Sequence, residues 1–433
     1  MSLTIISFGV LLFLALLLLG IPVAVVMVIV GIIGGLLTFG PAFIHNIGSV
    51  VWSTQNENLL TAIPLFILLG EILLRSGLAD RMYTSLAVWL QRLPGGLLHT
   101  NIGACALFAA TCGSSAATAA TVGTVALPNL LKRGYPIRPS LGSLAAGGTL
   151  GILIPPSVGL LVYGSLTNTS VGQLFIAGII PGILLSLSFS LLIFVQSLIG
   201  GWQSFDSGPS LSFIDRVRSS RHLLPVLFVF AVVMGGIYFG WATPTEAAAL
   251  GVFIALVLAR LSGRLTFAVL HDCFRHTAAL TGMMVLILVG AFVLNVTLSL
   301  SGIPQRITDA ISALGLSAGQ LVFWLAILYL ILGCFLDVLS MQVTTIPIAY
   351  PIVMHFGIDP IWFGIFVILM SEIAMITPPV GLNLFVMQSI RKDRGDIRDV
   401  AIGAAPYVLM MLGFVVLIWY AQQIVLWLPE KMT

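Results

Sequence analysis

Two short polar stretches interrupt long apolar sequence, and their atoms suit the binding of a small cation. Residues 113–121 read Gly-Ser-Ser-Ala-Ala-Thr-Ala-Ala-Thr, and residues 154–157 read Ile-Pro-Pro-Ser. Consecutive prolines inside a helix remove backbone donors and free carbonyl groups. In a membrane, irregular backbone is tolerated only where protein buries it or a wet cavity borders it. The two stretches are therefore either a seam for close helix packing or a binding site lined by hydroxyls and carbonyls.

A second pair of stretches repeats the first at a fixed distance along the chain. The proline pair at 155–156 recurs at 378–379, an offset of 223 residues. The same offset relates further positions: Ser114 with Asp337, Thr121 with Thr344, Pro128 with Pro351, and Gly134 with Gly357. Corresponding helix breaks in the two halves of a chain are typical of the binding site of a secondary transporter. The duplication favours a binding site over a packing seam.

The composition predicts a polytopic membrane protein. Hydrophobic residues make up 59% of the 433 residues, charged residues make up 8%, and the mean hydropathy is +1.14. A soluble globular chain carries about 25% charged residues, and apolar runs near the ~20 residues that span a bilayer recur here. The longest polar stretch, residues 201–221, is expected to be a loop. No basic patch interleaved with aromatic residues accompanies the net charge of +3, so no nucleic-acid partner is expected.

Two hairpins that enter the membrane from opposite faces are expected to carry the polar stretches. The first covers residues 94–131 and has basic residues at both ends, including Arg92 and Arg133. Since Lys and Arg collect in cytoplasmic loops, this hairpin is expected to enter from the cytoplasm. The second covers residues 316–355, and only Arg306 lies near its ends. We therefore expect it to enter from the periplasm.

A span broken by a proline pair is expected after each hairpin, over residues 141–168 and 361–390. Prolines in the middle of a span unwind the helix at that point. The charge bias also predicts that both chain termini are periplasmic. With their hairpins on opposite faces, the two repeats are inverted relative to each other.

Several motifs along essentially the whole chain resemble those of one family. They are residues 63–71 (Ile-Pro-Leu-Phe-Ile-Leu-Leu-Gly-Glu), 93–96 (Leu-Pro-Gly-Gly), 113–118, 148–157 (Gly-Thr-Leu-Gly-Ile-Leu-Ile-Pro-Pro-Ser), 242–249 (Ala-Thr-Pro-Thr-Glu-Ala-Ala-Ala) and 376–383 (Ile-Thr-Pro-Pro-Val-Gly-Leu-Asn). Together they resemble the large membrane subunit of tripartite ATP-independent periplasmic (TRAP) transporters. The resemblance implies an elevator-type, sodium-coupled importer in the bacterial inner membrane. It also implies two partners, a small four-helix membrane subunit and a periplasmic solute-binding protein that delivers the substrate.

The fold class that follows is an all-α polytopic membrane protein of the ion-transporter superfamily, an inverted repeat with two re-entrant hairpins and two broken helices. Residues 1–92 and 171–314 are expected to form scaffold helices, each set with one amphipathic arm. Residues 93–170 and 315–390 are expected to form the two halves of the transport domain. Residues 391–433 are expected to form a C-terminal loop and helix.

Two sodium sites are predicted, with no organic cofactor. Sodium, like calcium, takes hard oxygen ligands, and a hairpin tip that faces an unwound helix supplies them as carbonyls and hydroxyls. The ligands predicted for the first site are Gly113, Ser114, Ser115, Ile154, Pro155 and Pro156. Those predicted for the second site are Asp337, Ser340, Thr344, Thr377, Pro378 and Pro379. Asp337 is costly inside an apolar run and so functional by default, with capping of a nearby helix end as its alternative role.

A small organic acid is the expected substrate, and backbone donors are expected to bind its carboxylate. No Lys or Arg is assigned to the middle of the membrane, but half-helices are expected to begin near the hairpin tip and the proline pairs, and helix N-termini favour anions. The predicted substrate-binding residues are Ser115, Thr118, Ser157, Ser340, Gly381 and Asn383. The resemblance leaves C4-dicarboxylates, keto acids, sugar acids and sialic acids open.

Further acids lie in apolar surroundings. Structural or interfacial roles are expected for Glu71 and Glu246. The role of Glu372, about one turn before Thr377, stays open. It carries a proton if the coupling ion is H⁺ rather than Na⁺.

Other classes of function fit less well. An intramembrane hydrolase needs a base at the depth of its nucleophile, and no histidine is expected at the depth of Ser114 and Ser115, so no enzymatic activity is expected. The chain has no Gly-x-x-x-x-Gly-Lys motif of an ATP-driven pump. Hairpins from opposite faces suit alternating access better than a continuous channel. The alternative that stays open is a stand-alone sodium- or proton-coupled carboxylate transporter that works without a binding protein.

Overall fold

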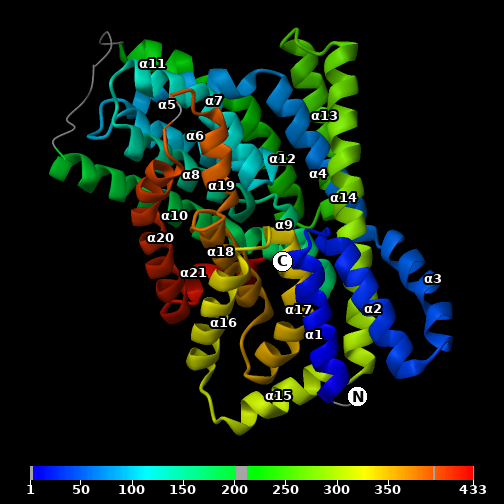
Figure 1. The fold of residues 1–433 in the computed structure, drawn as a ribbon. Coiled ribbons are helices and arrows are strands. Elements are labelled where there is room, and N and C mark those ends of the chain that lie inside the picture. Colours follow the sequence, from blue (N-terminus) through cyan, green and yellow to red (C-terminus); the bar gives the residue numbers. More distant parts are fainter. Residues whose placement is uncertain (1–2, 201–211, 394, 433) are drawn as a thin grey trace.

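The computed structural model describes residues 3–200, 212–393 and 395–432, and the regular structure within these ranges is helical. One group of helices lies on the right in Figure 1 and consists mainly of long apolar segments. It comprises α1 (Leu3–Leu18), α2 (Val23–Phe39), α3 (Ala42–Gln55), α4 (Asn58–Arg75), α12 (Leu224–Tyr238), α13 (Pro244–Leu261) and α14 (Phe267–Leu300).

Close helix contacts hold this first group together. Helix α14 packs on α2 and α4, and α13 packs on α4 and α12. A Cβ on Gly31 of α2 would lie 3.0 Å from the backbone N of Leu294 in α14. Thr297 also donates its hydroxyl to the Gly31 carbonyl at 2.8 Å. Since any side chain at Gly31 would push the two backbones apart, this glycine helps to set how closely the two helices cross.

The first predicted hairpin and broken span are present. The hairpin consists of α6 (Leu97–Cys112) and α7 (Ser115–Lys132), and the span consists of α8 (Ile137–Leu153) and α9 (Val158–Thr167). Helices α8 and α9 are bent by 40° at the break. The Pro155–Pro156 peptide bond within the break is cis.

The second hairpin and broken span repeat this plan. The hairpin consists of α16 (Ala318–Leu332) and α17 (Val338–His355), and the span consists of α18 (Pro360–Met375) and α19 (Leu382–Ile390). The Pro378–Pro379 peptide bond is also cis. Helices α6 and α7 lie toward the top of Figure 1 and α16 lies toward the bottom, so the hairpins enter from opposite ends. The predicted fold class, an inverted repeat with two hairpins and two broken helices, is confirmed.

Short amphipathic helices lie at the two ends of the molecule. Helix α5 (Leu78–Leu90) contacts α11 (Phe213–Ser220) near the top of Figure 1, and α15 (Ile303–Ala313) lies at the bottom. The prediction of a loop over residues 201–221 is wrong for residues 213–220, which form α11. Residues 201–211 of the predicted loop lie outside the described ranges. Local contacts explain this helix, because Trp89 of α5 packs edge-on against Phe213 and donates its indole N–H to Ser220 Oγ at 2.9 Å.

The remaining helices pack against the broken spans. Helices α10 (Val171–Gly200) and α20 (Ile397–Tyr420) both contact α8 and α18, and α21 (Gln423–Leu426) contacts α10 and α18. The predicted division of the chain into scaffold and transport domains stays a prediction.

Among the described residues, five helices are long and apolar enough to cross a membrane, or up to eight if each bent pair counts as one span.

Candidate functional site

The tip of the first hairpin lies directly against the first helix break. Gly113 has a left-handed backbone with a φ of 59°, which ends α6 and turns the chain into α7. A Cβ on Gly113 would lie 2.9 Å from the carbonyl oxygen of Pro156. On the other side, a Cβ on Gly151 of α8 would lie 2.7 Å from the carbonyl oxygen of Ser114. Glycine at both positions therefore lets the two irregular stretches meet, backbone against backbone.

The residues of this first break are buried and begin a new helix. Ile154 has an extended backbone, and the Ser157 hydroxyl accepts a hydrogen bond from the backbone N–H of Leu160 at 3.3 Å. Pro155 and Pro156 are both buried. The structure thus brings the ligands predicted for the first sodium site together.

The second hairpin tip covers less of its helix break than the first tip does. Cys334, at the end of the first arm, lies 3.7 Å from the carbonyl oxygen of Pro378, and Gly333 packs on Ala374. Unlike the first pair, Pro378 and Pro379 are exposed. The first break is therefore covered by its hairpin, while the second is open to the surroundings.

The predicted ligands on the second hairpin point in different directions. The Asp337 carboxylate accepts hydrogen bonds from the backbone N–H groups of Leu339 at 3.2 Å and Ser340 at 3.4 Å, so it caps the start of α17. Thr344 donates to the Ser340 carbonyl at 2.7 Å and lies 3.9 Å from the sulfur of Met27 in α2. The capping contact matches the alternative role of Asp337, and the second ligand set stays a prediction.

Several predicted substrate-binding residues cluster behind the first tip. Ser115 and Thr118 lie in the first turn of α7, and Asn383 lies in the first turn of α19. A Cβ on Gly148 of α8 would lie 3.1 Å from Asn383 Nδ2 and 3.2 Å from the Ser115 carbonyl, so both residues lie next to this glycine. Asn383 Nδ2 also donates to the Ala145 carbonyl at 3.4 Å.

Of the other three predicted substrate residues, Ser157 lies in the first break described above, and two mark helix starts in the second half. Gly381 has a φ of 43° and begins α19. Ser340 is buried in the first turn of α17, with its backbone N–H directed to Asp337. Neither contacts the cluster of Ser115, Thr118 and Asn383 through a hydrogen bond in the part of the chain that the structure describes.

Two further buried polar residues were not assigned to a site from the sequence, Glu372 in contact with this cluster and Gln342 against α9. Ser115 donates its hydroxyl to Oε1 of Glu372, which is completely buried in α18. The amide of Gln342 in α17 is completely buried, and Nε2 lies 3.2 Å from where a Cβ on Gly159 would be. The sequence feature that could have identified Glu372 and Gln342 is a polar side chain within an apolar run, which often marks a functional position.

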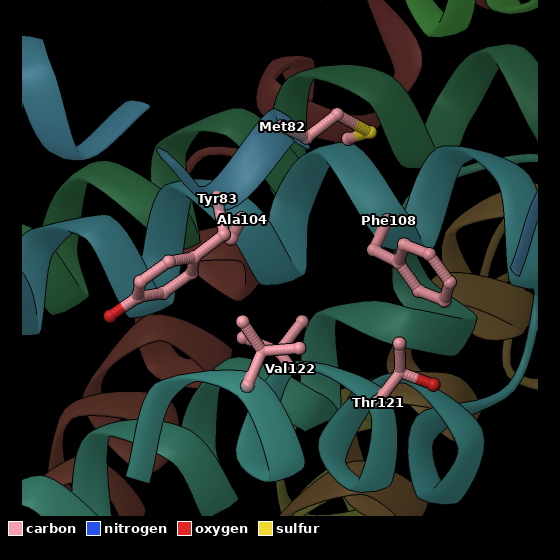
Figure 2. Close-up of a pocket in the computed structure, with 7 residues that line it drawn as sticks. Met82, Tyr83, Ala104, Phe108, Thr121 and Val122 are labelled. Carbon is pink, nitrogen blue, oxygen red and sulfur yellow. The ribbon is translucent and has the colours of Figure 1, made fainter. Parts of the chain in front are cut away.

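A small cavity beside the middle of the first hairpin, where α5 packs on α6 and α7, is distinct from this site. Met82 and Tyr83 of α5 and Ala104 and Phe108 of α6 lie above Thr121 and Val122 of α7 in this view (Figure 2). Val125 of α7 also lines the cavity. Tyr83 turns its hydroxyl to Asn101 Oδ1 at 3.0 Å. The apolar lining indicates a place where the arm α5 packs loosely on the hairpin rather than a site for an ion.

Comparison with known proteins assigns the chain to a family. The family model described as "Tripartite ATP-independent periplasmic transporter, DctM component" matches residues 10–424. The chain belongs to this family. The Pseudomonas aeruginosa C4-dicarboxylate TRAP transporter large permease protein DctM is 35% identical, with 91% of this chain and 92% of that protein covered.

Other DctM relatives differ in the substrates that their names give. The Ruegeria pomeroyi ectoine/5-hydroxyectoine TRAP transporter large permease UehC is 32% identical, and 96% of each chain is covered. The Oleidesulfovibrio alaskensis isethionate TRAP transporter permease DctMQ is 31% identical, with 94% of this chain and 63% of that protein covered.

A solved transporter structure has the same fold as this DctM chain. The YdaH transporter of Alcanivorax borkumensis superimposes with a TM-score of 0.66 at 16% identity, covering 96% of this chain and 98% of the other. The family match and the permease relatives make the chain a multi-pass protein of the bacterial inner membrane and a TRAP large permease.

Proposed function

We propose that this chain is the large permease of a three-component importer that uses a sodium gradient to bring a small organic acid into the cell. The observation that carries the proposal is the contact of the tip at residues 113–115 with the break at residues 154–157. Facing irregular segments of this kind supply the carbonyl and hydroxyl oxygens that a weakly held cation needs.

The residues present fit a sodium ion at the first tip. Thr118 Oγ1 and Glu372 Oε2 are buried without a hydrogen-bond partner in the described part of the chain. Buried polar atoms are costly unless they are paired, so this region has unused oxygens. Ser114, Ser115 and the carbonyls of residues 154–156 would hold the ion. When bound, it would supply the positive charge that makes closure of the hairpin favourable.

The substrate is proposed to be a small carboxylate. Helices α7, α9 and α19 all begin in this region, at Ser115, Val158 and Leu382, and their free N–H groups favour a negative charge. The Asn383 amide would add a donor. The names of the P. aeruginosa and R. pomeroyi relatives point to C4-dicarboxylate or ectoine, both of which carry carboxyl groups.

A small four-helix membrane subunit and a periplasmic solute-binding protein are the proposed partners. The family description includes a tripartite, periplasmic system. The name DctMQ and the greater length of the O. alaskensis relative support a second membrane component beside the large permease. The alternative of a stand-alone transporter differs in one measurable respect, because it needs no binding protein.

Uptake in proteoliposomes tests the proposed function. The chain is reconstituted with its small subunit, and radiolabelled succinate is supplied with or without the binding protein, under an inward gradient of Na⁺ or of K⁺. We expect uptake only with Na⁺ and only with the binding protein. Ectoine and sialic acid serve as competitors that report the substrate class. Sodium-driven uptake without the binding protein would favour the stand-alone alternative, and accumulation that a proton gradient alone drives would contradict sodium coupling.

A further inference from the structure

Glu372 is a completely buried acid in the middle of the transporter. Helix α18 is buried from Trp362 to Met375, and its polar side chains are those of Ser371 and Glu372. Ser371 donates to the Val367 carbonyl of its own helix at 2.7 Å. Glu372 has no such local partner, so its position must be explained by what lies across from it.

The partner of Glu372 comes from the other half of the repeat. Ser115, the first residue of α7, donates its hydroxyl to Glu372 Oε1. The second oxygen, Oε2, has no hydrogen-bond partner, and Glu372 takes part in none of the ion pairs found among the described residues. A buried carboxylate with no cation is strongly unfavourable. A proton or a cation from outside the chain would satisfy it, and the sodium site proposed beside Ser115 favours the cation.

The internal duplication identifies which residues of the first half correspond to the acids Asp337 and Glu372 of the second half. The offset of 223 residues pairs Ser114 with Asp337, so the second hairpin tip has a carboxylate where the first has a hydroxyl. The same offset pairs Glu372 with Thr149 in the first half. Thr149 is neutral, and its hydroxyl donates to the Ala146 carbonyl at 2.6 Å.

The two hairpin tips therefore each have one carboxylate beside them, although the sequence gives an acid only to the second tip. Asp337 belongs to the tip of its own hairpin and caps α17. Ser114 occupies the same capping position in α7 and makes no side-chain capping bond. At this first tip, the carboxylate comes from α18 of the opposite half, through its contact with Ser115.

We propose that Glu372 is the anionic ligand of the sodium site at the first hairpin tip, equivalent in charge to Asp337 at the second. Its Oε1 holds the Ser115 hydroxyl, and its Oε2 is the oxygen that contacts the cation. This inference rests on the sodium coupling proposed above. It adds that the site is built from both halves of the repeat, so cation binding draws the first hairpin onto α18.

Equilibrium binding of radioactive sodium to the purified large and small subunits tests this role without any transported substrate. The background variant Asp337→Ala isolates the first site. In that background, Glu372→Gln keeps the size of the side chain and an acceptor for Ser115 but removes the charge. We expect it to weaken sodium binding by at least about 10-fold, because losing even a residue that only supports a metal ligand typically costs about 10- to 100-fold in affinity. The matched control is Glu71→Gln, because Glu71 forms an ion pair with Arg75 at 2.9 Å within α4. The Glu71→Gln protein is expected to bind sodium with unchanged affinity.

Two further variants separate charge from folding. Adding Ser114→Asp to the Glu372→Gln protein places an acid at the position equivalent to Asp337, and we expect it to recover part of the affinity. If Glu372→Gln does not fold, Glu372→Asp takes its place and is expected to bind with reduced but measurable affinity. Unchanged affinity in Glu372→Gln, or in Glu372→Asp where that variant is used, would overturn the inference. If the wild-type protein binds no sodium, the proposed coupling ion is wrong, which is a different result from a variant that binds as well as the wild type.

Discussion

At the scale of single residues, glycines decide how closely the helices around the site approach. A Cβ on Gly403 of α20 would lie 2.1 Å from the Arg138 carbonyl in α8, whereas one on Gly413 of the same helix has nothing within 4 Å. The atom that this Cβ would meet belongs to the backbone, which cannot turn aside as a side chain can. These two glycines therefore form a matched pair.

We expect Gly403→Ala to destabilise the protein by about 1–3 kcal/mol, the usual cost of overpacking. Gly413→Ala is expected to be neutral or slightly stabilising, because alanine favours a helix over glycine. Thermal unfolding of the purified protein in detergent measures both. Equal melting temperatures for the two variants would show that the α8–α20 contact adjusts freely.

Residue types predicted the first tip well and the second tip poorly. Gly113 and the proline pair at 155–156 act locally, through a left-handed turn and missing donors, so the sequence marks where the helices stop. The direction of Thr344 depends instead on packing against Met27, 317 residues away. The partner of Glu372 likewise could not be deduced, since nothing near it in the sequence indicates that Ser115 lies opposite.

At the scale of elements, Arg391 ties the end of α19 to the start of α20. Its guanidinium bonds to Asp393 and, at 3.0 Å, to Asp399, and it donates to the Asp396 carbonyl at 2.9 Å. The bond to Arg391 holds the pKa of Asp393 below its usual range. Because the pKa is lower in the folded state, the contact stabilises the fold at neutral pH and is lost as the pH falls through that lowered value.

The variant Arg391→Gln is expected to melt at a lower temperature than the wild type at pH 7. The difference should shrink as the pH falls below about 4, where aspartates become protonated, and also in high salt, since Asp393 is exposed. Arg398→Gln is the control, because the Arg398 side chain is 86% exposed and its contact with the Asp396 carboxylate is long, at 3.9 Å. A constant difference between Arg391→Gln and wild type at every pH would mean that the side chain acts through packing alone.

The helices and their breaks were largely predictable from the sequence, and the short amphipathic helices were less so. Apolar runs bounded by glycine, proline and basic residues indicated both hairpins and both broken spans. Helix α11 was missed, because its eight residues from Phe213 to Ser220 are polar overall and are fixed by contacts with Trp89 of α5. Contacts of that kind join elements far apart in the chain.

At the scale of the whole molecule, the two repeats share a plan but differ in exposure. Pro155 and Pro156 are buried under the first hairpin, whereas Pro378 and Pro379 are exposed beside the second. The duplication could be read from the offset of 223 residues, but its unequal closure could not, because both copies carry the same prolines. An importer that alternates between two faces needs such a difference in at least one of its states.

The most direct test of the account is whether sodium binds at the two hairpin tips. We would measure the melting temperature of the large and small subunits in NaCl, KCl and choline chloride at equal ionic strength. A ligand that binds only the native state, at a hundredfold excess over its Kd, adds about 2.7 kcal/mol to the free energy of unfolding. We expect a saturable rise in NaCl only, reduced by Ser114→Ala and by Asp337→Ala. Identical melting in all three salts would contradict it.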